Sequence, residues 1–545
     1  YHYSDKYKAI QHPHLERDLL REQIEACHAR DIRVPIYVTV QWDLHTVKEH
    51  PEWLTMDANG CHTGTPPFQA GFYTKLCLNT GYVDWLEEYV ADICDTLPTD
   101  GFFFDIVDKV DCSCRQCIKG MLEAGLDPSS PADRMDWAGR VLQRFEERLT
   151  KVVQSKHPEA TIFYNAGHIG PHHRSILPNY THLELESLPS GGWGYMHFPL
   201  TQRFARNLHL DTMGMTGKFH TSWGDFESLK NPLALEFECQ NMLALAAKCS
   251  IGDQLHPTGQ ISKATYELVG EAYADVEAVE PWCQGSRPVV DIGLMTPEEF
   301  AGGSAFSLSG SAMGAVRLLQ EGFHQFDVID SKSDLSRYRL LVLPDGIEVN
   351  ESLALRLRAY LAQGGALVAS YRSGLNPAGT AFDLAELGVR LKGEAPWSPD
   401  FIVPGILGEG LRHTPYVMYQ KGLEVEAATS SHILCEMIKP YFNRDWRHFC
   451  SHQHTPAEGH ASYPGVVQHG NCIYFMHPIF NQYDSNAPLW CKRLVLNAIK
   501  RLLPDPLVEA QAPSSALFTL NEQVAENRLV LHALHYVPER RGRAF

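Results

Sequence analysis

The sequence has no long apolar segment, and it has few basic residues relative to acidic ones. No uninterrupted apolar run reaches about 18 residues, so no membrane span is predicted. The N-terminal stretch "YHYSDKYKAI" is polar and does not resemble the apolar core of a signal peptide. The 47 basic and 65 acidic residues give a formal net charge of -18. That charge disfavours nucleic acid and anionic membranes as partners, and it suits a neutral substrate.

Sequence motifs for bound cofactors are also missing. Neither of the glycine-rich patterns GxxxxGKS/T and GxGxxG is present, so nucleotide binding is not indicated. The pattern HExxH, which places two zinc ligands and a general base on one helix face, does not occur either. We therefore expect catalysis without a cofactor.

Cysteine is present, but not in a pattern typical of a disulfide-stabilised secreted domain. The 14 cysteines are scattered through 545 residues. Such a distribution is typical of thiols that stay reduced, and it predicts a cytoplasmic protein.

The chain is long enough for two or three domains. Over residues 1–285, apolar strand-like runs alternate with amphipathic helical patterns, which predicts a parallel sheet covered by helices. Seven such runs are found, at residues 31–43, 73–79, 100–107, 160–167, 182–189, 211–220 and 249–257. An eighth strand upstream of residue 1 would complete a (β/α)8 TIM-type barrel, whose first strand is then missing from this chain.

An open, doubly wound sheet is the alternative to the barrel. Polar and aromatic residues recur at the C-terminal ends of almost all the predicted strands. In a barrel these ends converge on one active site, whereas in an open sheet they would spread along an edge. The residues expected to contact a substrate are Trp42, Asp43, Asn165, His168, Glu184, Trp193, His220, Trp223, Asp253 and His256.

The pattern of apolar and polar residues changes after residue 285. The runs "VVDIGLMT", "RYRLLVLPDG" and "GGALVAS" are apolar strands, with helices expected near 311–322 and 351–363. Residues 286–505 therefore resemble a flavodoxin-like or glutamine-amidotransferase-like α/β domain, although no cysteine stands where amidotransferase chemistry needs one. Residues 506–545 alternate apolar and polar residues around a turn, which predicts a hairpin at the start of a small C-terminal β-domain.

Acidic residues at strand ends are the main candidates for catalysis. Asp105 follows the apolar run "GFFF" and is expected to face the mouth of the barrel. Glu184 and Glu186 share one face of a strand because side chains alternate with period two, and Glu186 is nearer the C-terminal rim. Two carboxylates near rim tryptophans fit glycoside hydrolysis, in which one group attacks and the other protonates the leaving oxygen. We predict Asp105 and Glu186 as the catalytic pair.

A second group of candidate functional residues is a cysteine cluster in "DCSCRQC", which supplies Cys112, Cys114 and Cys117. This density of cysteines within one loop is typical of thiolate coordination, most plausibly of structural zinc. A fourth ligand is needed, and Cys77 or Cys61 is the nearest candidate. The alternative is a set of reduced cysteines with a packing role only.

Several stretches together resemble one family of enzymes. They are "HPHLERDLLREQIEACHARDIRVPIYVTVQWD", "HPEW", "GFFFDIVDKVDCSCRQC", "ELESLPSGGWGYMHFP" and "GDQLHPTG". They resemble the bacterial proteins of glycoside hydrolase family 151, which are α-L-fucosidases distantly similar to the family 29 fucosidases. The second domain is similar to the trimerisation domain of the family 42 β-galactosidases, which implies a homo-oligomer.

The resemblance implies a retaining exo-glycosidase that hydrolyses terminal α-L-fucosyl residues. It implies an Asp nucleophile at the end of the fourth barrel strand, a position that Asp105 matches, and a carboxylic acid/base from a later strand, for which Glu186 is the candidate. In family 42 enzymes a cysteine cluster near this point holds zinc, which favours a metal at Cys112, Cys114 and Cys117. Two alternatives stay open: a β-galactosidase or related exo-glycosidase, and a non-catalytic carbohydrate-binding or scaffold protein.

Overall fold

The computed structural model describes residues 2–7, 10–65, 68–71, 74–303 and 307–538. The chain forms two compact units. The first contains Tyr1–His168 and His172–Glu184, and the second contains Ile169–Pro171 and Leu185–Phe545. Each unit is described separately below.

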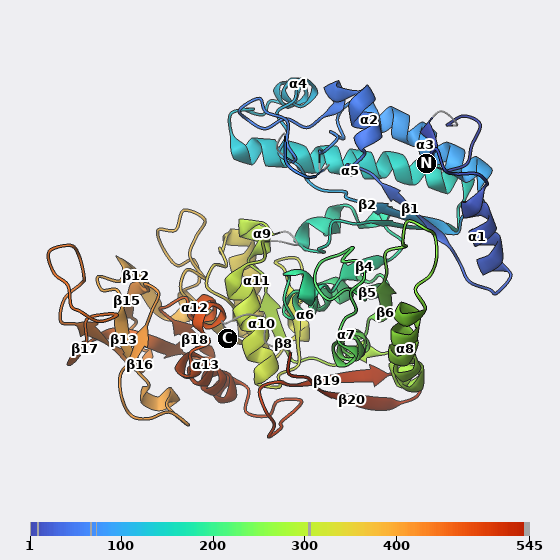
Figure 1. The fold of residues 1–545 in the computed structure, drawn as a ribbon. Coiled ribbons are helices and arrows are strands. Elements are labelled where there is room, and N and C mark those ends of the chain that lie inside the picture. The colour runs from blue at the N-terminus through green and yellow to red at the C-terminus, as the bar shows by residue number, and fades with distance from the viewer. Residues whose placement is uncertain (1, 8–9, 66–67, 72–73, 304–306, 539–545) are drawn as a thin grey trace. The chain divides into compact units, whose positions relative to one another are not determined.

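The first unit contains a parallel three-stranded sheet in the order β1-β2-β3. Its strands are β1 (Pro35–Thr39), β2 (Gly101–Asp105) and β3 (Thr161–Tyr164), and its helices are α1 (Leu19–His28), α2 (Leu44–Glu49), α3 (Tyr82–Thr96), α4 (Arg115–Glu123) and α5 (Pro131–Lys156). The helices α3 and α5 run along the sheet in Figure 1. Phe102, Phe104 and Tyr164 are buried on the face toward them, and Tyr164 Oη lies 2.8 Å from Thr150 Oγ1 of α5. The alternation of strands and helices in this region is therefore confirmed.

The strand expected at residues 73–79 is wrong for the part of it that the structure describes. Thr74 and Leu76 make only isolated antiparallel bridges, to Gly64 and Leu54. Residues 72 and 73 lie outside the described chain. The apolar residues of this run are buried because the segment leads Cys77 into a cysteine cluster, described below, rather than because it joins the parallel sheet.

The second unit begins with another parallel set of three strands, in the order β4-β5-β6. The strands are β4 (Leu183–Glu186), β5 (Thr212–Gly217) and β6 (Lys248–Gly252), and the helices between and after them are α6 (His197–Ala205), α7 (Pro232–Ala244) and α8 (Lys263–Cys283). Gly214 of β5 shows how closely two helices pack here. A Cβ atom at that position would lie 2.6 Å from Met242 of α7 and 2.8 Å from Phe198 of α6. Leu183 and Leu185 are buried, whereas Glu184 and Glu186 alternate with them and point to the other face.

A nine-stranded mixed sheet forms the core of the following region, in the order β14-β13-β16-β17-β18-β11-β10-β8-β9. Its parallel part contains β8 (Ile292–Met295), β9 (Phe326–Ile329), β10 (Leu340–Leu343), β11 (Ala366–Ser370) and β18 (Cys472–Phe475). Its antiparallel part contains β13 (Asp400–Val403), β14 (Tyr416–Met418), β16 (His432–Pro440) and β17 (Ala457–His469). The associated helices are α9 (Glu298–Ala301), α10 (Gly310–Glu321), α11 (Glu351–Ala362), α12 (Ile479–Asn486) and α13 (Leu489–Leu502), and a separate antiparallel pair joins β12 (Val389–Glu394) to β15 (Leu423–Ala427). The expected strands and the helices near 311–322 and 351–363 are confirmed.

The hairpin expected near the C-terminus is also confirmed. β19 (Ala516–Gln523) pairs with β20 (Arg528–His535), and β19 also pairs with the short strand β7 (Arg287–Pro288). The hairpin lies against α7 in Figure 1, and the side-chain amide of Asn521 donates a hydrogen bond of 3.0 Å to the backbone carbonyl of Ala244.

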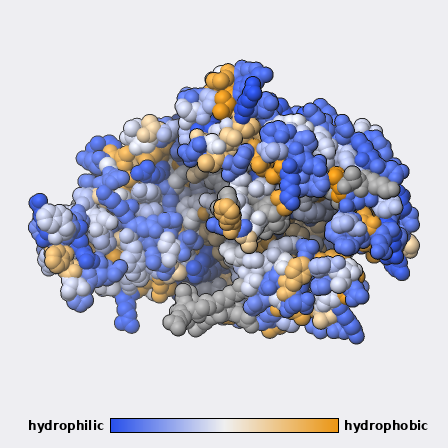
Figure 2. Space-filling view, turned by 45° about the horizontal axis from the view of Figure 1, so that its top comes forward, coloured by the Kyte–Doolittle hydropathy of each residue, from blue (hydrophilic) through white to orange (hydrophobic). Residues whose placement is uncertain are grey.

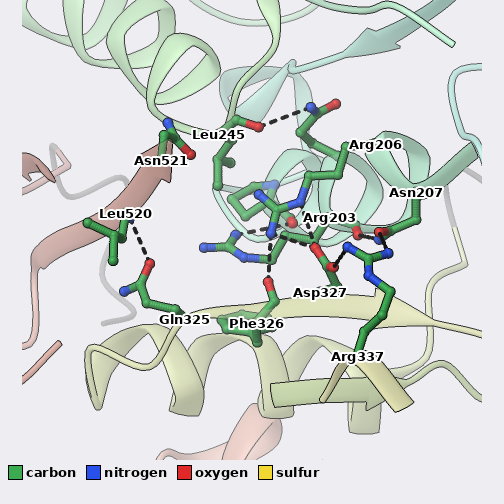
Figure 3. A network of polar contacts seen from close by, with 12 residues as sticks. Arg203, Arg206, Asn207, Leu245, Gln325, Phe326, Asp327, Arg337, Leu520 and Asn521 are labelled. Atoms are coloured by element: carbon green, nitrogen blue, oxygen red, sulfur yellow. Dashed lines mark hydrogen bonds and ion pairs between the residues drawn. The ribbon is translucent and has the colours of Figure 1, made fainter. Parts of the chain in front are cut away.

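A buried ion pair joins α6 to β9 within the second unit (Figure 3). Arg206, which follows α6, donates from Nε to Asp327 Oδ1 and from Nη2 to the Phe326 carbonyl, both at 2.8 Å. Tyr338 donates to the other carboxylate oxygen of Asp327 at 3.0 Å. The guanidinium of Arg203 lies 4.3 Å from the centre of the Phe326 ring. These contacts hold the helix that follows the Glu186 strand against the nine-stranded sheet.

The face of the molecule drawn in Figure 2 is largely hydrophilic. In the view of Figure 2, hydrophobic residues lie singly or in small groups among hydrophilic ones. Within the described residues, no helix is both long enough and apolar enough to cross a membrane.

Candidate active site and cysteine cluster

Asp105 is the last residue of β2, and both of its carboxylate oxygens accept hydrogen bonds. Tyr37 Oη of β1 donates to Oδ2 at 2.5 Å, and Asn165 Nδ2, just after β3, donates to Oδ1 at 2.8 Å. The three residues come from three adjacent strands or strand ends of one sheet. The two donors fix the orientation of the carboxylate. This geometry suits a group that acts as a nucleophile.

Tyr37 was not among the residues predicted from the sequence. The pairing register places Tyr37 opposite Phe103 and Thr39 opposite Asp105, so these four side chains share one face of the sheet. The Tyr37 ring stacks on Phe103 with 5.9 Å between ring centres, which lets its hydroxyl reach along the strand to Asp105. Thr39 Oγ1 lies 3.3 Å from that hydroxyl. The sequence signal for Tyr37 is its alternation with Thr39 in "PIYVT", which marks a polar face of an otherwise apolar strand.

The other predicted residues of the first unit have varied surroundings. Asp43 caps α2, accepting hydrogen bonds from the backbone amides of His45 and Thr46 at 3.0 and 3.2 Å. Glu184 Oε1 lies 2.9 Å from His182 Nε2. His168 is buried, and Trp42, three residues beyond the end of β1, is half-buried.

In the second unit, Glu186 ends β4 and is half-buried. A turn of 3-10 helix, Pro189–Gly191, follows it and leads into the loop that carries Trp193. The Trp193 ring packs on His197 at the start of α6, with 4.4 Å between ring centres. The loop that carries Trp193 is therefore attached to the helix that follows Glu186.

The loops after β5 and β6 meet through Trp223. Its ring lies over Gly252, where a Cβ atom would be 2.3 Å from the indole, and its Nε1 donates to Gln254 Oε1 at 3.3 Å. His220 follows β5 and is exposed, while Asp253 follows β6 and is half-exposed. His256 is exposed, and its Nδ1 lies 2.9 Å from Thr258 Oγ1.

Four buried cysteines of the first unit form one cluster: Cys77, Cys112, Cys114 and Cys117. The Sγ atom of Cys77 lies 3.6 Å from that of Cys117 and 3.7 Å from those of Cys112 and Cys114. A tetrahedral zinc ion with Zn–S bonds of about 2.3 Å requires about 3.8 Å between sulfur atoms. The cluster therefore matches the size and donor set of a structural zinc site.

The two candidates for the fourth cysteine differ in position. Cys77 lies in the cluster, whereas Cys61 is exposed and its backbone pairs with Asp57 in a turn. The backbone amide of Asn79 points to Cys77 Sγ at 3.4 Å, and that of Cys114 points to Cys112 Sγ at 3.5 Å. Amide donors favour thiolate, the form that binds metal.

Two family models match parts of the chain. Residues 1–106 match a family described as hypothetical glycosyl hydrolase 6, and residues 317–386 match the β-galactosidase trimerisation domain. No curated protein matches the chain.

Solved structures are similar over nearly the whole chain. The α-L-fucosidase isoenzyme 2 from Paenibacillus thiaminolyticus is 40% identical, with a TM-score of 0.93 over 97% of this chain and 81% of that one. The β-galactosidase from Bacillus circulans sp. alkalophilus is 15% identical, with a TM-score of 0.73 over 95% and 86% of the two chains. The cold-adapted β-galactosidase from Rahnella sp. R3 is also 15% identical, with a TM-score of 0.69 over 95% and 85%.

The likeness to the two β-galactosidases extends to the fold alone, because their sequence identity is low. Together with the closer likeness to the fucosidase, it confirms a TIM-barrel glycosidase fold with a β-rich C-terminal region. An open, doubly wound sheet for the first 285 residues is thereby set aside.

Proposed function

The chain belongs to the family of glycoside hydrolases that includes the P. thiaminolyticus α-L-fucosidase, and on that basis we propose that it is a retaining exo-α-L-fucosidase. The observation that carries the proposal is the position of Asp105, at a strand end with a hydrogen-bond donor on each carboxylate oxygen. The substrate is a glycan or glycoside with a terminal α-L-fucosyl residue. The resemblance to family 151 supports the same substrate.

The proposed reaction has two steps, with Asp105 as nucleophile and Glu186 as acid/base. In the first, a carboxylate oxygen of Asp105 bonds to the anomeric carbon, the bond to the leaving oxygen breaks, and Glu186 gives its proton to that oxygen. In the second, Glu186 takes a proton from water, the water oxygen bonds to the anomeric carbon, and the Asp105 carboxylate is released. The sugar leaves with its original anomeric configuration. Asn165 and Tyr37 hold the carboxylate of Asp105 throughout.

The rim residues are proposed to contact the sugar. Aromatic rings pack on the apolar face of a pyranose, and imidazole, amide and carboxylate groups hydrogen-bond its hydroxyls. The residues assigned this role are Trp42, Asp43, Asn165, His168, Glu184, Trp193, His220, Trp223, Asp253 and His256.

Product configuration and substrate range test the proposal. Hydrolysis of 4-nitrophenyl α-L-fucoside, followed by NMR in the first minutes, should release α-L-fucose before mutarotation. The corresponding β-D-galactoside should be hydrolysed at least about tenfold more slowly. Release of β-L-fucose would refute retention, and preference for the galactoside would refute the fucosidase assignment in favour of a β-galactosidase.

We further propose that Cys77, Cys112, Cys114 and Cys117 bind a structural zinc ion. Four thiolates leave no open position for water or substrate, so the ion would stabilise the fold and take no part in hydrolysis. The cluster ties the loop that follows Asp105 to the segment that precedes α3. Catalysis itself is proposed to need no cofactor.

Finally, we propose the domain organisation and assembly of the chain. The parallel strands of the nine-stranded sheet run in the order β9-β8-β10-β11-β18, which is the 2-1-3-4-5 order of flavodoxin-like domains. This order supports a flavodoxin-like domain over residues 286–505, between a barrel over 1–285 and a β-domain that starts at 506. The match to a trimerisation domain supports a homo-oligomer. The free cysteines support a cytoplasmic location.

A further inference from the structure

A pocket of about 240 Å³ lies in the second unit, beyond the carboxyl ends of β4 and β5. Ser190, from the turn four residues after Glu186, lines one side, and His220, which follows β5, lines another. Helix α7 supplies Glu238, the loop before it supplies Lys230, and Tyr195 and Tyr536 are among the other lining residues. Tyr536 follows β20, so the C-terminal hairpin takes part in the pocket.

The charges on the pocket lining cancel. Lys230 Nζ lies 2.5 Å from Glu238 Oε2, and both side chains are at least nine-tenths buried. Lys230 also donates to Thr216 Oγ1 at 2.8 Å, and Thr216 in turn donates to Glu238. A paired cation and anion give the lining little net charge, so it is poorly suited to an ionic ligand. A neutral ligand fits it better.

The polar network leaves one strong donor available. In the part of the chain that the structure describes, the Lys230 ammonium has two acceptors for its three N–H groups. Tyr195 donates to Glu238 Oε1 at 3.1 Å, and burial raises the pKa of Tyr195, so the phenol stays protonated. The third N–H of Lys230 is thus the buried polar group that a ligand can satisfy. A hydroxyl oxygen is a suitable acceptor for it.

Aromatic rings form the other part of the lining. Tyr536 stacks on Phe237 of α7 with 5.0 Å between ring centres, and Tyr195 lies 6.0 Å from Tyr536. These rings pack on one another, and aromatic surfaces of this kind pack against the C–H face of a sugar. Paired aromatic rings beside a buried donor, with no net charge, are the features of a site for a hydroxyl-rich neutral molecule.

We propose that this pocket is a saccharide subsite that holds the leaving-group sugar of the substrate. The inference rests on the proposed function, in which Glu186 gives a proton to the leaving oxygen. Ser190 of the pocket lies four residues after Glu186, so the pocket is assigned to the sugar that carries this oxygen. It adds a binding site made from the β4 and β5 loops, α7 and the C-terminal hairpin. The subsite would give the enzyme a preference for fucosylated glycans over fucosides with small leaving groups.

Calorimetric titration with galactose, N-acetylglucosamine, lactose and N-acetyllactosamine tests the subsite without any need for catalysis. At least one of these sugars should bind saturably, and inorganic phosphate should not. Tyr536→Ala should weaken that binding at least about tenfold, whereas Tyr536→Phe should keep most of it. The double variant Lys230→Met/Glu238→Gln removes both charges together and so avoids a lone buried charge. It should weaken binding similarly, which covers the case in which Tyr536→Ala fails to fold.

Tyr266→Ala is the matched control, because Tyr266 is an exposed tyrosine of α8 that does not line the pocket. It should bind the sugars like the unchanged protein. No saturable binding of any of the four sugars, binding that both pocket variants leave intact, or binding of phosphate instead would overturn the inference. Failure of the proposed function gives a different pattern, in which sugars bind the pocket but α-L-fucosides are not hydrolysed.

For an active enzyme, a second measurement compares kcat/KM on 2′-fucosyllactose with kcat/KM on 4-nitrophenyl α-L-fucoside. The ratio should fall at least about fivefold in Tyr536→Ala and stay unchanged in Tyr266→Ala. An equal loss on both substrates would contradict a site for the leaving group.

Discussion

The hydroxyl of Tyr37 donates a hydrogen bond of 2.5 Å to Oδ2 of Asp105, while the ring that carries it stacks on Phe103. Tyr37 and Asp105 come from neighbouring strands, and the Thr39 hydroxyl lies within 3.3 Å of the same phenol oxygen. Phe103, two residues before Asp105, thus supports the ring of the tyrosine that orients the carboxylate. This contact links the packing of the sheet to the orientation of the proposed nucleophile.

Tyr37→Phe should lower kcat about 10–100-fold and change KM little. The variant keeps the ring on Phe103 but removes a donor to a charged oxygen, and such a bond contributes about 1.5–3 kcal/mol. Tyr37 is 57% exposed, so the missing hydroxyl should barely affect stability. Steady-state kinetics on an aryl α-L-fucoside measure the effect. Tyr3→Phe, at another exposed tyrosine of the same unit, serves as control, and a Tyr37→Phe variant with normal kcat would show that the contact has no role in the reaction.

The cysteine cluster should contain one zinc ion per chain. Cys114→Ser should abolish most of the bound zinc, measured by elemental analysis of the purified protein, because it removes one of four thiolates. Cys61→Ser should leave the zinc content unchanged, since Cys61 is exposed and outside the cluster. A strong chelator should lower the melting temperature of the unchanged protein but not that of Cys114→Ser. Equal zinc content in the two variants would rule out the site.

The ion pair between Arg206 and Asp327 should stabilise the second unit. Asp327→Ala leaves the Arg206 guanidinium buried without its carboxylate, and such a break typically costs about 3–5 kcal/mol. We expect a melting temperature lowered by several degrees. Glu267→Ala is the control, because the Lys263–Glu267 pair is exposed and should contribute little. Equal melting temperatures for the two variants would show that the network in Figure 3 carries no stability.

Glu146 of α5 should make stability depend on pH. Burial raises the pKa of this carboxyl to about 8, and Tyr180 donates to its Oε1 at 3.0 Å. Below the unfolded pKa of about 4.3, both states hold the proton and there is no dependence. Between about 4.3 and 8 the unfolded state releases the proton while the folded state keeps it. The free energy of unfolding therefore falls with rising pH, by about 1.4 kcal/mol per pH unit, and levels off above 8.

Glu146→Gln should remove this dependence. The variant should match the unchanged protein near pH 4 and be more stable at pH 7, in denaturation followed by far-UV circular dichroism. Glu123→Gln changes an exposed carboxyl of α4 and should preserve the original pH dependence. Parallel pH profiles for Glu146→Gln and the unchanged protein would mean that Glu146 is ionised in the folded state.

The sequence predicts the elements of this fold better than their contacts. The place of Asp105 at a strand end could be predicted because a single acidic residue ends a continuous apolar run, and that signal is local. Tyr37 could not, because its role depends on the register that sets Thr39 beside Asp105, and register is fixed by tertiary pairing. The strand predicted at 73–79 is wrong for the described residues because the apolar side chains of this run are buried for another reason, which is to place Cys77 in the cluster.

The pocket in the second unit had no signal in the sequence at all. Glu238 lies in a helix and Lys230 in the loop before it, and Tyr536 lies almost 300 residues further along the chain. Each of these residues, taken alone, has an ordinary explanation as a helix, loop or strand residue. Only the packing of the C-terminal hairpin on α7 brings them together.

Trapping of the covalent intermediate tests the central claim most directly. Incubation with 2-deoxy-2-fluoro-α-L-fucosyl fluoride should inactivate the enzyme, because the fluorine slows release of the sugar more than its transfer to the nucleophile. Peptide mass spectrometry should then find one fluorofucosyl group on Asp105, and Asp105→Ala should acquire none. Rapid turnover of an α-L-fucoside without any trapped sugar, or a sugar attached to another carboxylate, would contradict the assignment of Asp105 as the nucleophile.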